Sequence, residues 1–251
     1  KIIILIVTFT FIFSQSEQPY PPLKLISMPT AGTLPKGTFT FETLLMNKGG
    51  LLPSFSIGIT DHFTIGFSFG IQEFIGTGSF KKNKSYPEAQ IKYRIFEETE
   101  TRPSIVFGLD TQGKGKYINK IERYEQKAIG AYFILSRNYE ILGNLGFHIG
   151  INKNLFEDFD GDDDINLFFG FDRELNRSFS LMAEYDFAIN DNDFDDSEYI
   201  IRKGRGYLNT GVRWSATNNL MLEINVNDIS KNNELYDSMN REVKIIYFES
   251  F

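Results

Sequence analysis

Alternation of bulky apolar residues with small or polar residues runs through most of the chain after Gly37. In residues 62–71, HFTIGFSFGI, every second residue from Phe63 onward is Phe or Ile, and those between are Thr, Gly or Ser. A period of two is that of a β-strand, whose successive side chains point to opposite faces, and a helix does not repeat in this way. The pattern returns at residues 145–151, 165–171, 179–187, 208–214, 220–226 and 243–247. It predicts an all-β protein.

Twelve predicted strands follow from this pattern, and their connections alternate in length. The strands are expected at 37–46, 51–60, 62–73, 86–97, 102–111, 127–137, 140–151, 164–173, 178–189, 206–216, 219–228 and 241–249. From the second strand onward, tight turns alternate with long polar loops at 74–85, 112–126, 152–163, 190–205 and 229–240. Even strand number, short turns at one end and long loops at the other are typical of bacterial outer-membrane barrels, whose short turns and termini face the periplasm. We predict a single transmembrane antiparallel up-and-down β-barrel of about 12 strands over residues 37–251.

The first 36 residues precede the alternating region and differ from it. Residues 1–16 place Lys1 before an apolar run that is too short to span a bilayer as a helix but fits a signal peptide, with cleavage after Ser14 or Ser16. The alternative is a buried N-terminal strand. Residues 17–36 contain five prolines and are predicted to be a periplasmic lead-in, either free or tucked into the barrel mouth. No later stretch suits a transmembrane helix, so a membrane-embedded chain of this kind has to cross as a closed barrel.

Composition agrees with a barrel and excludes several other classes. The chain has 25 Phe and 12 Tyr among 251 residues, and aromatic residues both favour strands and form girdles at lipid interfaces. It has no cysteine, which excludes a disulfide scaffold and a thiolate metal site. Its net charge of -7 argues against nucleic acid as a partner. Phe251, directly after the last alternating segment, is predicted to be the signal that the barrel-assembly machinery recognises.

If the bulky face meets lipid, the opposite face lines the interior. The charged residues share the interior parity, which is expected because an Arg or Lys facing lipid costs about 2–4 kcal/mol at the midplane. The candidate lumen residues are Glu42, Lys92, Arg94, Asp110, His148, Asp172, Glu184, Asp186, Arg213, Glu223 and Lys244. They either pair across a filled interior and hold it shut, or line a narrow aqueous pore. Twelve strands lie between filled eight-stranded barrels and open sixteen-stranded porins, so strand number does not decide between these interpretations.

Two of the long loops are rich in aspartate, which suggests a metal site. In the run EDFDGDDD, Asp158, Asp160, Asp162 and Asp164 place carboxylates at alternate positions, which suits Ca²⁺. Gly161 comes too early for an EF-hand loop, and no closing Glu follows at the required distance. The other interpretation is a solvated acidic rim that bridges to lipopolysaccharide through divalent ions. No other cofactor is expected.

The sequence does not predict an enzyme. Its two histidines are His62, at a predicted turn, and His148, on the interior face. A membrane phospholipase built on such a barrel would need His and Ser side by side on the outer face. The sequence contains no nucleophile elbow, phosphate-binding Gly-rich loop or zinc-ligand spacing.

Three stretches of the first 150 residues share short motifs with a known family. They are SMPTAGTLPKGTFTF (27–41), RPSIVFGLDTQGKGKY (102–117) and AIGAYFILSRNY (128–139). Together they resemble the YjbH-type outer-membrane proteins associated with exopolysaccharide operons, with Ser136 and Arg137 in place of the family's Ser-Lys. The likeness covers about residues 25–150, and members of that family are larger. It implies the barrel fold and an outer-membrane location.

The predicted function is therefore a small outer-membrane channel, or a component of envelope or polysaccharide export. The alternative is a non-conducting barrel that scaffolds a surface or periplasmic assembly. A wide, glycine-rich lumen would favour the first, and ion pairs that fill the lumen would favour the second. The expected partners are outer-membrane lipid, lipopolysaccharide, the barrel-assembly machinery and proteins of an envelope complex.

Overall fold

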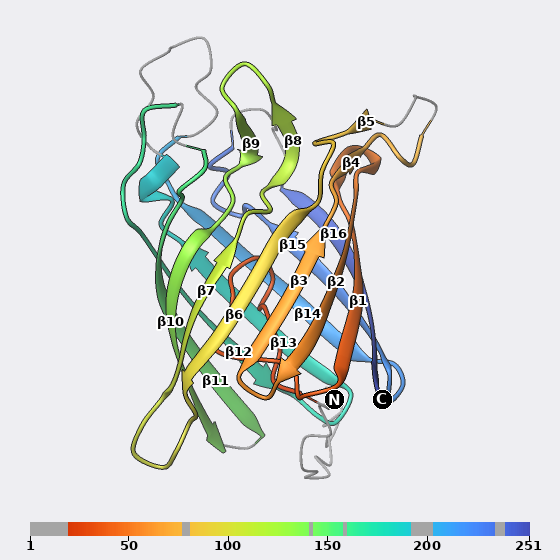
Figure 1. Ribbon diagram of the computed structural model, residues 1–251, viewed down its shortest axis with the longest axis vertical. Coiled ribbons are helices and arrows are strands. Elements are labelled where there is room, and N and C mark those ends of the chain that lie inside the picture. Colours follow the sequence, from red (N-terminus) through yellow and green to blue (C-terminus); the bar gives the residue numbers. More distant parts are fainter. Residues whose placement is uncertain (1–19, 77–80, 141–142, 158–159, 192–202, 234–238) are drawn as a thin grey trace, which may run out of the picture.

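A closed barrel of twelve antiparallel strands forms the body of the molecule (Figure 1). The computed structural model describes residues 20–76, 81–140, 143–157, 160–191, 203–233 and 239–251. The barrel strands are β1 (Thr38–Leu45), β2 (Leu51–Thr60), β3 (Phe63–Ser68), β6 (Glu88–Phe96), β7 (Ser104–Asp110), β10 (Gly130–Glu140), β11 (Asn144–Lys153), β12 (Asn166–Glu174), β13 (Phe179–Asp186), β14 (Tyr207–Ser215), β15 (Leu220–Asn227) and β16 (Asn240–Ser250). The twelve predicted strands are confirmed, each within a few residues.

The sheet closes because β1 pairs with both β2 and β16. Glu42 on β1 lies opposite Ser54 on β2 and opposite Ile246 on β16. Closure leaves no strand edge of the barrel unpaired, which is the condition for crossing a bilayer with strands. At the end of β16, the backbone N–H of Phe251 donates to the carbonyl of Gly37 at 3.1 Å, while the Phe251 side chain is exposed.

The bulky face of each strand points outward, as the alternation predicted. On β11, Phe147 and Ile149 are about half exposed, whereas His148 between them is buried. Aromatic rings meet on the outer surface near both ends of the barrel. Near the turn end, Phe179 stacks on Trp214 with ring centroids 6.1 Å apart. An outer surface with an apolar band and aromatic groups near its two ends is the surface that lipid covers in membrane barrels.

Small elements gather at the long-loop end, which is uppermost in Figure 1. They are η1 (Asn47–Gly49), β4 (Ile71–Gln72), β5 (Lys81–Lys82), the hairpin of β8 (Lys114–Ile118) and β9 (Arg123–Gln126), and η2 (Ile189–Asp191). None of the helices in the described ranges is long and apolar enough to cross a membrane. The hairpin occupies the predicted loop 112–126, and Arg123 and Tyr124, the first two residues of β9, are fully buried.

Residues 20–36, here called the plug segment, lie inside the barrel near its turn end. A tight turn joins the N–H of Leu25 to the carbonyl of Met28 at 2.9 Å. Leu25, Ile26 and Leu34 are at most 1% exposed. The sequence predicted that residues 17–36 form a periplasmic lead-in, either free or tucked into the barrel mouth. In the structure, residues 20–36 are packed inside the barrel, against the inner face of its wall. Burial of each such side chain contributes about 1.5–3 kcal/mol, which favours the interior position over a solvated one.

Candidate functional site

Glu184 of β13 holds the plug segment by its backbone. Its buried carboxylate accepts hydrogen bonds from three consecutive N–H groups, those of Ile26, Ser27 and Met28, at 2.9–3.1 Å. Asn209 of β14 donates to the same carboxylate at 2.8 Å. Hydrogen bonds to an ionised acceptor are stronger than those between neutral groups, so this residue is a principal anchor of the segment.

Cationic side chains of the wall hold the carbonyl groups of the same segment. Lys92 of β6 donates to the carbonyls of Leu23, Thr30 and Gly32. Arg213 of β14 donates to those of Lys24 and Leu25, and Lys244 of β16 reaches that of Ile26 at 3.4 Å. Charged groups of both signs are thus used to satisfy backbone that would otherwise be buried without partners.

Apolar contacts complete the attachment of the plug segment. One cluster joins Met28 and Ala31 to wall residues that include Ile134 and Phe168, all buried. A second cluster joins Leu34 to wall residues that include Phe248. These wall side chains lie on the face that would line a pore, where water would otherwise cover them. The interior is therefore built to contact protein at these positions.

A ladder of charged side chains crosses three neighbouring strands. Glu223 of β15 lies opposite Arg213 on β14 and opposite Lys244 on β16. Its carboxylate is 2.7 Å from Arg213 Nε and 3.0 Å from Lys244 Nζ. All three side chains are nearly or fully buried, so each charge depends on its neighbours for neutralisation.

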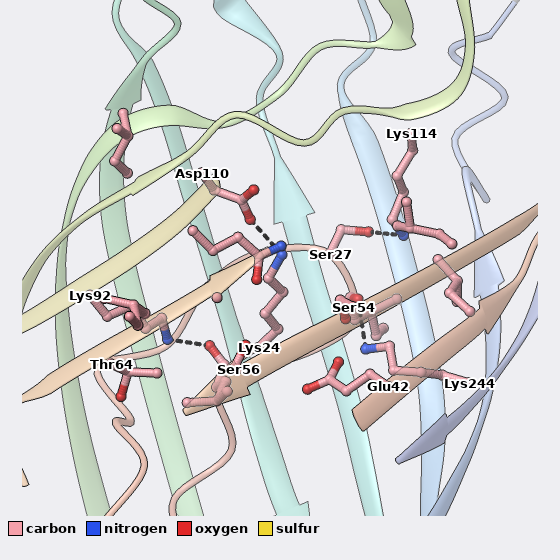
Figure 2. A pocket seen from close by; sticks show the side chains of 18 of the residues that line it. Lys24, Ser27, Glu42, Ser54, Ser56, Thr64, Lys92, Asp110, Lys114 and Lys244 are labelled. Atoms are coloured by element: carbon pink, nitrogen blue, oxygen red, sulfur yellow. Dashed lines mark hydrogen bonds and ion pairs between the residues drawn. The ribbon is translucent and has the colours of Figure 1, made fainter. Parts of the chain in front are cut away.

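Two cavities lie one above the other, and Lys114 separates them. The inner cavity, about 70 Å³, lies between the plug segment and the wall (Figure 2). The outer one, about 260 Å³ and here called the vestibule, lies between the β8–β9 hairpin and the wall formed by β14, β15 and β16. Lys114 lines both; its Nζ is 2.7 Å from Ser27 Oγ and 3.0 Å from Glu242 of β16. It thus joins the hairpin, the plug segment and the wall.

All eleven candidate lumen residues lie on the interior face. Glu42 and Arg94 are half-buried, and the other nine are buried. The side-chain contacts of Lys92, Glu184, Arg213, Glu223 and Lys244 are given above. Asp110 pairs with Lys24 of the plug segment at 2.5 Å. Arg94 donates hydrogen bonds to Thr33 and to the carbonyl of Asp61, near the turn end. The carboxylate of Asp186 accepts hydrogen bonds from the Asn166 side chain and from the N–H of Ala188, neither of which belongs to the plug segment.

His148 and Asp172 belong to a hydrogen-bonded chain that sequence reasoning missed. Ser136 Oγ lies 2.7 Å from His148 Nδ1, and His148 Nε2 lies 2.8 Å from Asp172. Ser136 Oγ also accepts the N–H of Ala31 at 2.8 Å, so the chain ends on the plug segment. Ser136 and His148 are cross-strand partners on β10 and β11. The alternating pattern shows which face of a strand a residue occupies, but not which residue lies opposite it on the next strand. The pairing of Ser136 with His148 therefore could not be predicted from the pattern.

Asp160, in the acidic loop 152–163, forms ion pairs with cationic side chains of the protein. Asp160 pairs with Arg123 at 2.6 Å and with Lys127 at 2.7 Å. Burial would lower the pKa of Arg123, but the ion pairs to Asp191 and Asp160 hold it above its ordinary value. These contacts tie three long loops together at the mouth.

The Ca²⁺ site stays a prediction. Asp158 lies outside the described residues, Asp162 Oδ1 accepts the N–H of Asp164, and Asp164 is exposed. In the parts of the chain that the structure describes, no group of three or more acidic or histidine side chains is arranged to hold a metal ion. The pairing of Asp160 with two cations leaves less of its charge for a metal.

Comparison with known proteins identifies the fold. No family model and no curated protein sequence matches the chain. Among solved structures, it is similar to the KdgM porin in complex with disordered oligogalacturonate, with 11% identity and a TM-score of 0.52, over 85% of this chain and 99% of that one. A second KdgM porin structure gives 10% identity and a TM-score of 0.50, over the same shares of 85% and 99%. The chain has the fold of an outer-membrane porin.

This porin-like barrel is an outer-membrane protein, since a closed barrel with an outward apolar band is the form in which strands cross that membrane. A NanC porin structure matches more weakly, with 10% identity, a TM-score of 0.43, and coverage of 84% of this chain and 99% of that one. The comparisons give no evidence for the YjbH-type resemblance, which stays a prediction.

Proposed function

We propose that the chain is an outer-membrane channel for small solutes that its own plug segment keeps closed. The observation that carries this proposal is the position of residues 20–36 in the lumen, where their backbone N–H and carbonyl groups are held largely by hydrogen bonds with charged wall residues. Water can replace such bonds when a segment leaves, which makes a polar attachment reversible at moderate cost.

The two cavities support the same proposal. From the long-loop end, the vestibule leads to Lys114, the inner cavity lies beyond it, and the plug segment closes the inner side. An interior path interrupted at two places is the arrangement expected of a closed channel. The finer role, as a component of envelope or polysaccharide export, rests on the YjbH-type resemblance and is part of the proposal.

The apolar clusters favour a second candidate function. Because Leu34 and Met28 pack against apolar wall residues, the segment also has the character of a permanent core. In that case the barrel does not conduct, and it scaffolds a surface or periplasmic assembly.

Single-channel conductance of the Glu184→Gln variant distinguishes the closed channel from the non-conducting scaffold. The amide cannot accept three N–H groups as the carboxylate does, and loss of hydrogen bonds to a charged group costs about 1.5–3 kcal/mol each. The open fraction should therefore rise at least about tenfold over wild type. Asp186→Asn is the matched control, because Asp186 is a buried interior carboxylate whose bonds go to Asn166 and Ala188. If neither wild type nor Glu184→Gln conducts while both fold, the scaffold is the better description.

A further inference from the structure

The vestibule is lined to an unusual degree by carboxamide side chains. Asn209, Asn227 and Asn240 come from the three wall strands β14, β15 and β16, and Gln72 and Gln126 come from β4 and β9. A carboxamide offers both a donor and an acceptor, as does the hydroxyl group of a sugar. The lining therefore matches hydroxyl groups better than it matches an apolar or an ionic ligand.

Two of these amides have an oxygen without a hydrogen-bond partner among the residues that the structure describes. Asn227 is 8% exposed and lies opposite Asn240 across the β15–β16 pair, and the unpaired atom is Oδ1 in each. Asn225, two residues deeper on the same face of β15, does not line the vestibule; it is fully buried, and neither of its amide atoms has a partner in the described part of the chain. Buried polar groups in proteins are nearly always satisfied, so such a group at the edge of a cavity points to a ligand that completes it.

Charged side chains of both signs also line the vestibule, and several of them already have partners in the protein. Lys114 pairs with Glu242 at 3.0 Å, and Glu73 is 3.6 Å from Lys81. The carboxylate of Asp228 accepts the backbone N–H groups of two nearby asparagines at 2.7 and 2.8 Å. An ionic ligand would have to compete with these contacts, whereas an uncharged ligand would leave them intact.

We propose that the vestibule binds an uncharged, polyhydroxylated ligand, namely a neutral sugar or a short neutral oligosaccharide. The proposal deepens the proposed channel by naming the ligand class at its loop-side opening, but it requires binding only. Binding and conduction are measured separately, so either can fail while the other holds.

Calorimetric titration of the folded full chain in detergent tests the proposal. The probes are maltotriose, which is neutral, and trigalacturonate, which is acidic. Asn227→Leu keeps the branched shape and the number of heavy atoms of the side chain and removes both hydrogen-bonding groups, and it should weaken maltotriose binding by about tenfold. Asn219→Leu, in the short turn between β14 and β15 at the opposite end of the barrel, is the matched control and should bind as wild type does.

Each variant is first shown to be folded by its faster migration on gels without boiling. Binding of maltotriose that Asn227→Leu weakens and Asn219→Leu does not is the result expected. Absence of measurable binding of maltotriose to wild type would overturn the proposal, and so would tighter binding of trigalacturonate than of maltotriose. Equal weakening by the two variants would also overturn it, because the vestibule would then not be the binding site.

Discussion

Neighbouring residues of one strand meet lipid and the barrel interior in turn. On β3, Phe67 is 46% exposed, whereas Ser68 is fully buried. Gly66 also faces the interior, and a Cβ at this position would meet Ser56 Oγ at 2.5 Å. The carbonyl oxygen of Phe55 would lie 2.7 Å from the same Cβ, so β2 excludes a side chain at position 66 although Gly66 lines the inner cavity. Parity alone could predict which face Gly66 occupies, and only the packing shows how closely β2 approaches it.

Phe67→Arg should lower the folded fraction in lipid vesicles, because the charge would lie in the apolar band. The expected cost is about 2–4 kcal/mol near the bilayer midplane. Phe67→Leu is the control, since it keeps an apolar side chain at the same place and should fold nearly as wild type does. Equal folding of the Arg variant and wild type would show that position 67 does not face lipid.

The sequence predicted which face of a strand a side chain occupies better than it predicted which residue that side chain contacts. The interior position of His148 follows from the period of two, but its partner Ser136 is identified only by the register of β10 against β11. The same limit applies to Glu184, whose bonds reach residues about 158 positions earlier in the chain. A local pattern carries no information about such contacts.

Elements with a strong period were predicted well, and those without one were not. The twelve barrel strands follow the alternation closely, whereas the β8–β9 hairpin was expected only as the polar loop 112–126. The plug segment has five prolines in or next to it and no period, so its composition resembled a linker. Its burial depends on the surrounding wall, which forms only when distant strands pair.

The orientation of the elements in the membrane has its own test. A peptide tag inserted at Lys120, between β8 and β9, should be reached by an antibody on intact cells, because long loops face the exterior in such barrels. A tag at Asn218, in the short turn between β14 and β15, should be reached only after the outer membrane is permeabilised. The reverse labelling pattern would invert the orientation.

At the scale of the whole molecule, the barrel and the plug segment form one packed unit. The wall supplies charged anchors and apolar contacts, and the segment supplies backbone groups and buried side chains that meet them. The result is a porin-like barrel with a plug segment near its turn end and a vestibule toward its loop end. Such a molecule conducts only if the segment moves.

Reversible cross-linking of the plug segment to the barrel wall is the most direct test of the claim that this segment closes the channel. The chain has no cysteine, so Ala31→Cys with Ser136→Cys introduces a single pair, at positions where Ala31 N and Ser136 Oγ are 2.8 Å apart. Single-channel conductance is then compared in one preparation before and after reduction, with Ala31→Cys alone as the control for oxidation. A closed channel gated by the segment should show openings that oxidation abolishes and reduction restores. Equal conductance in the fully cross-linked and reduced states, or its absence in both, would contradict gating by residues 20–36.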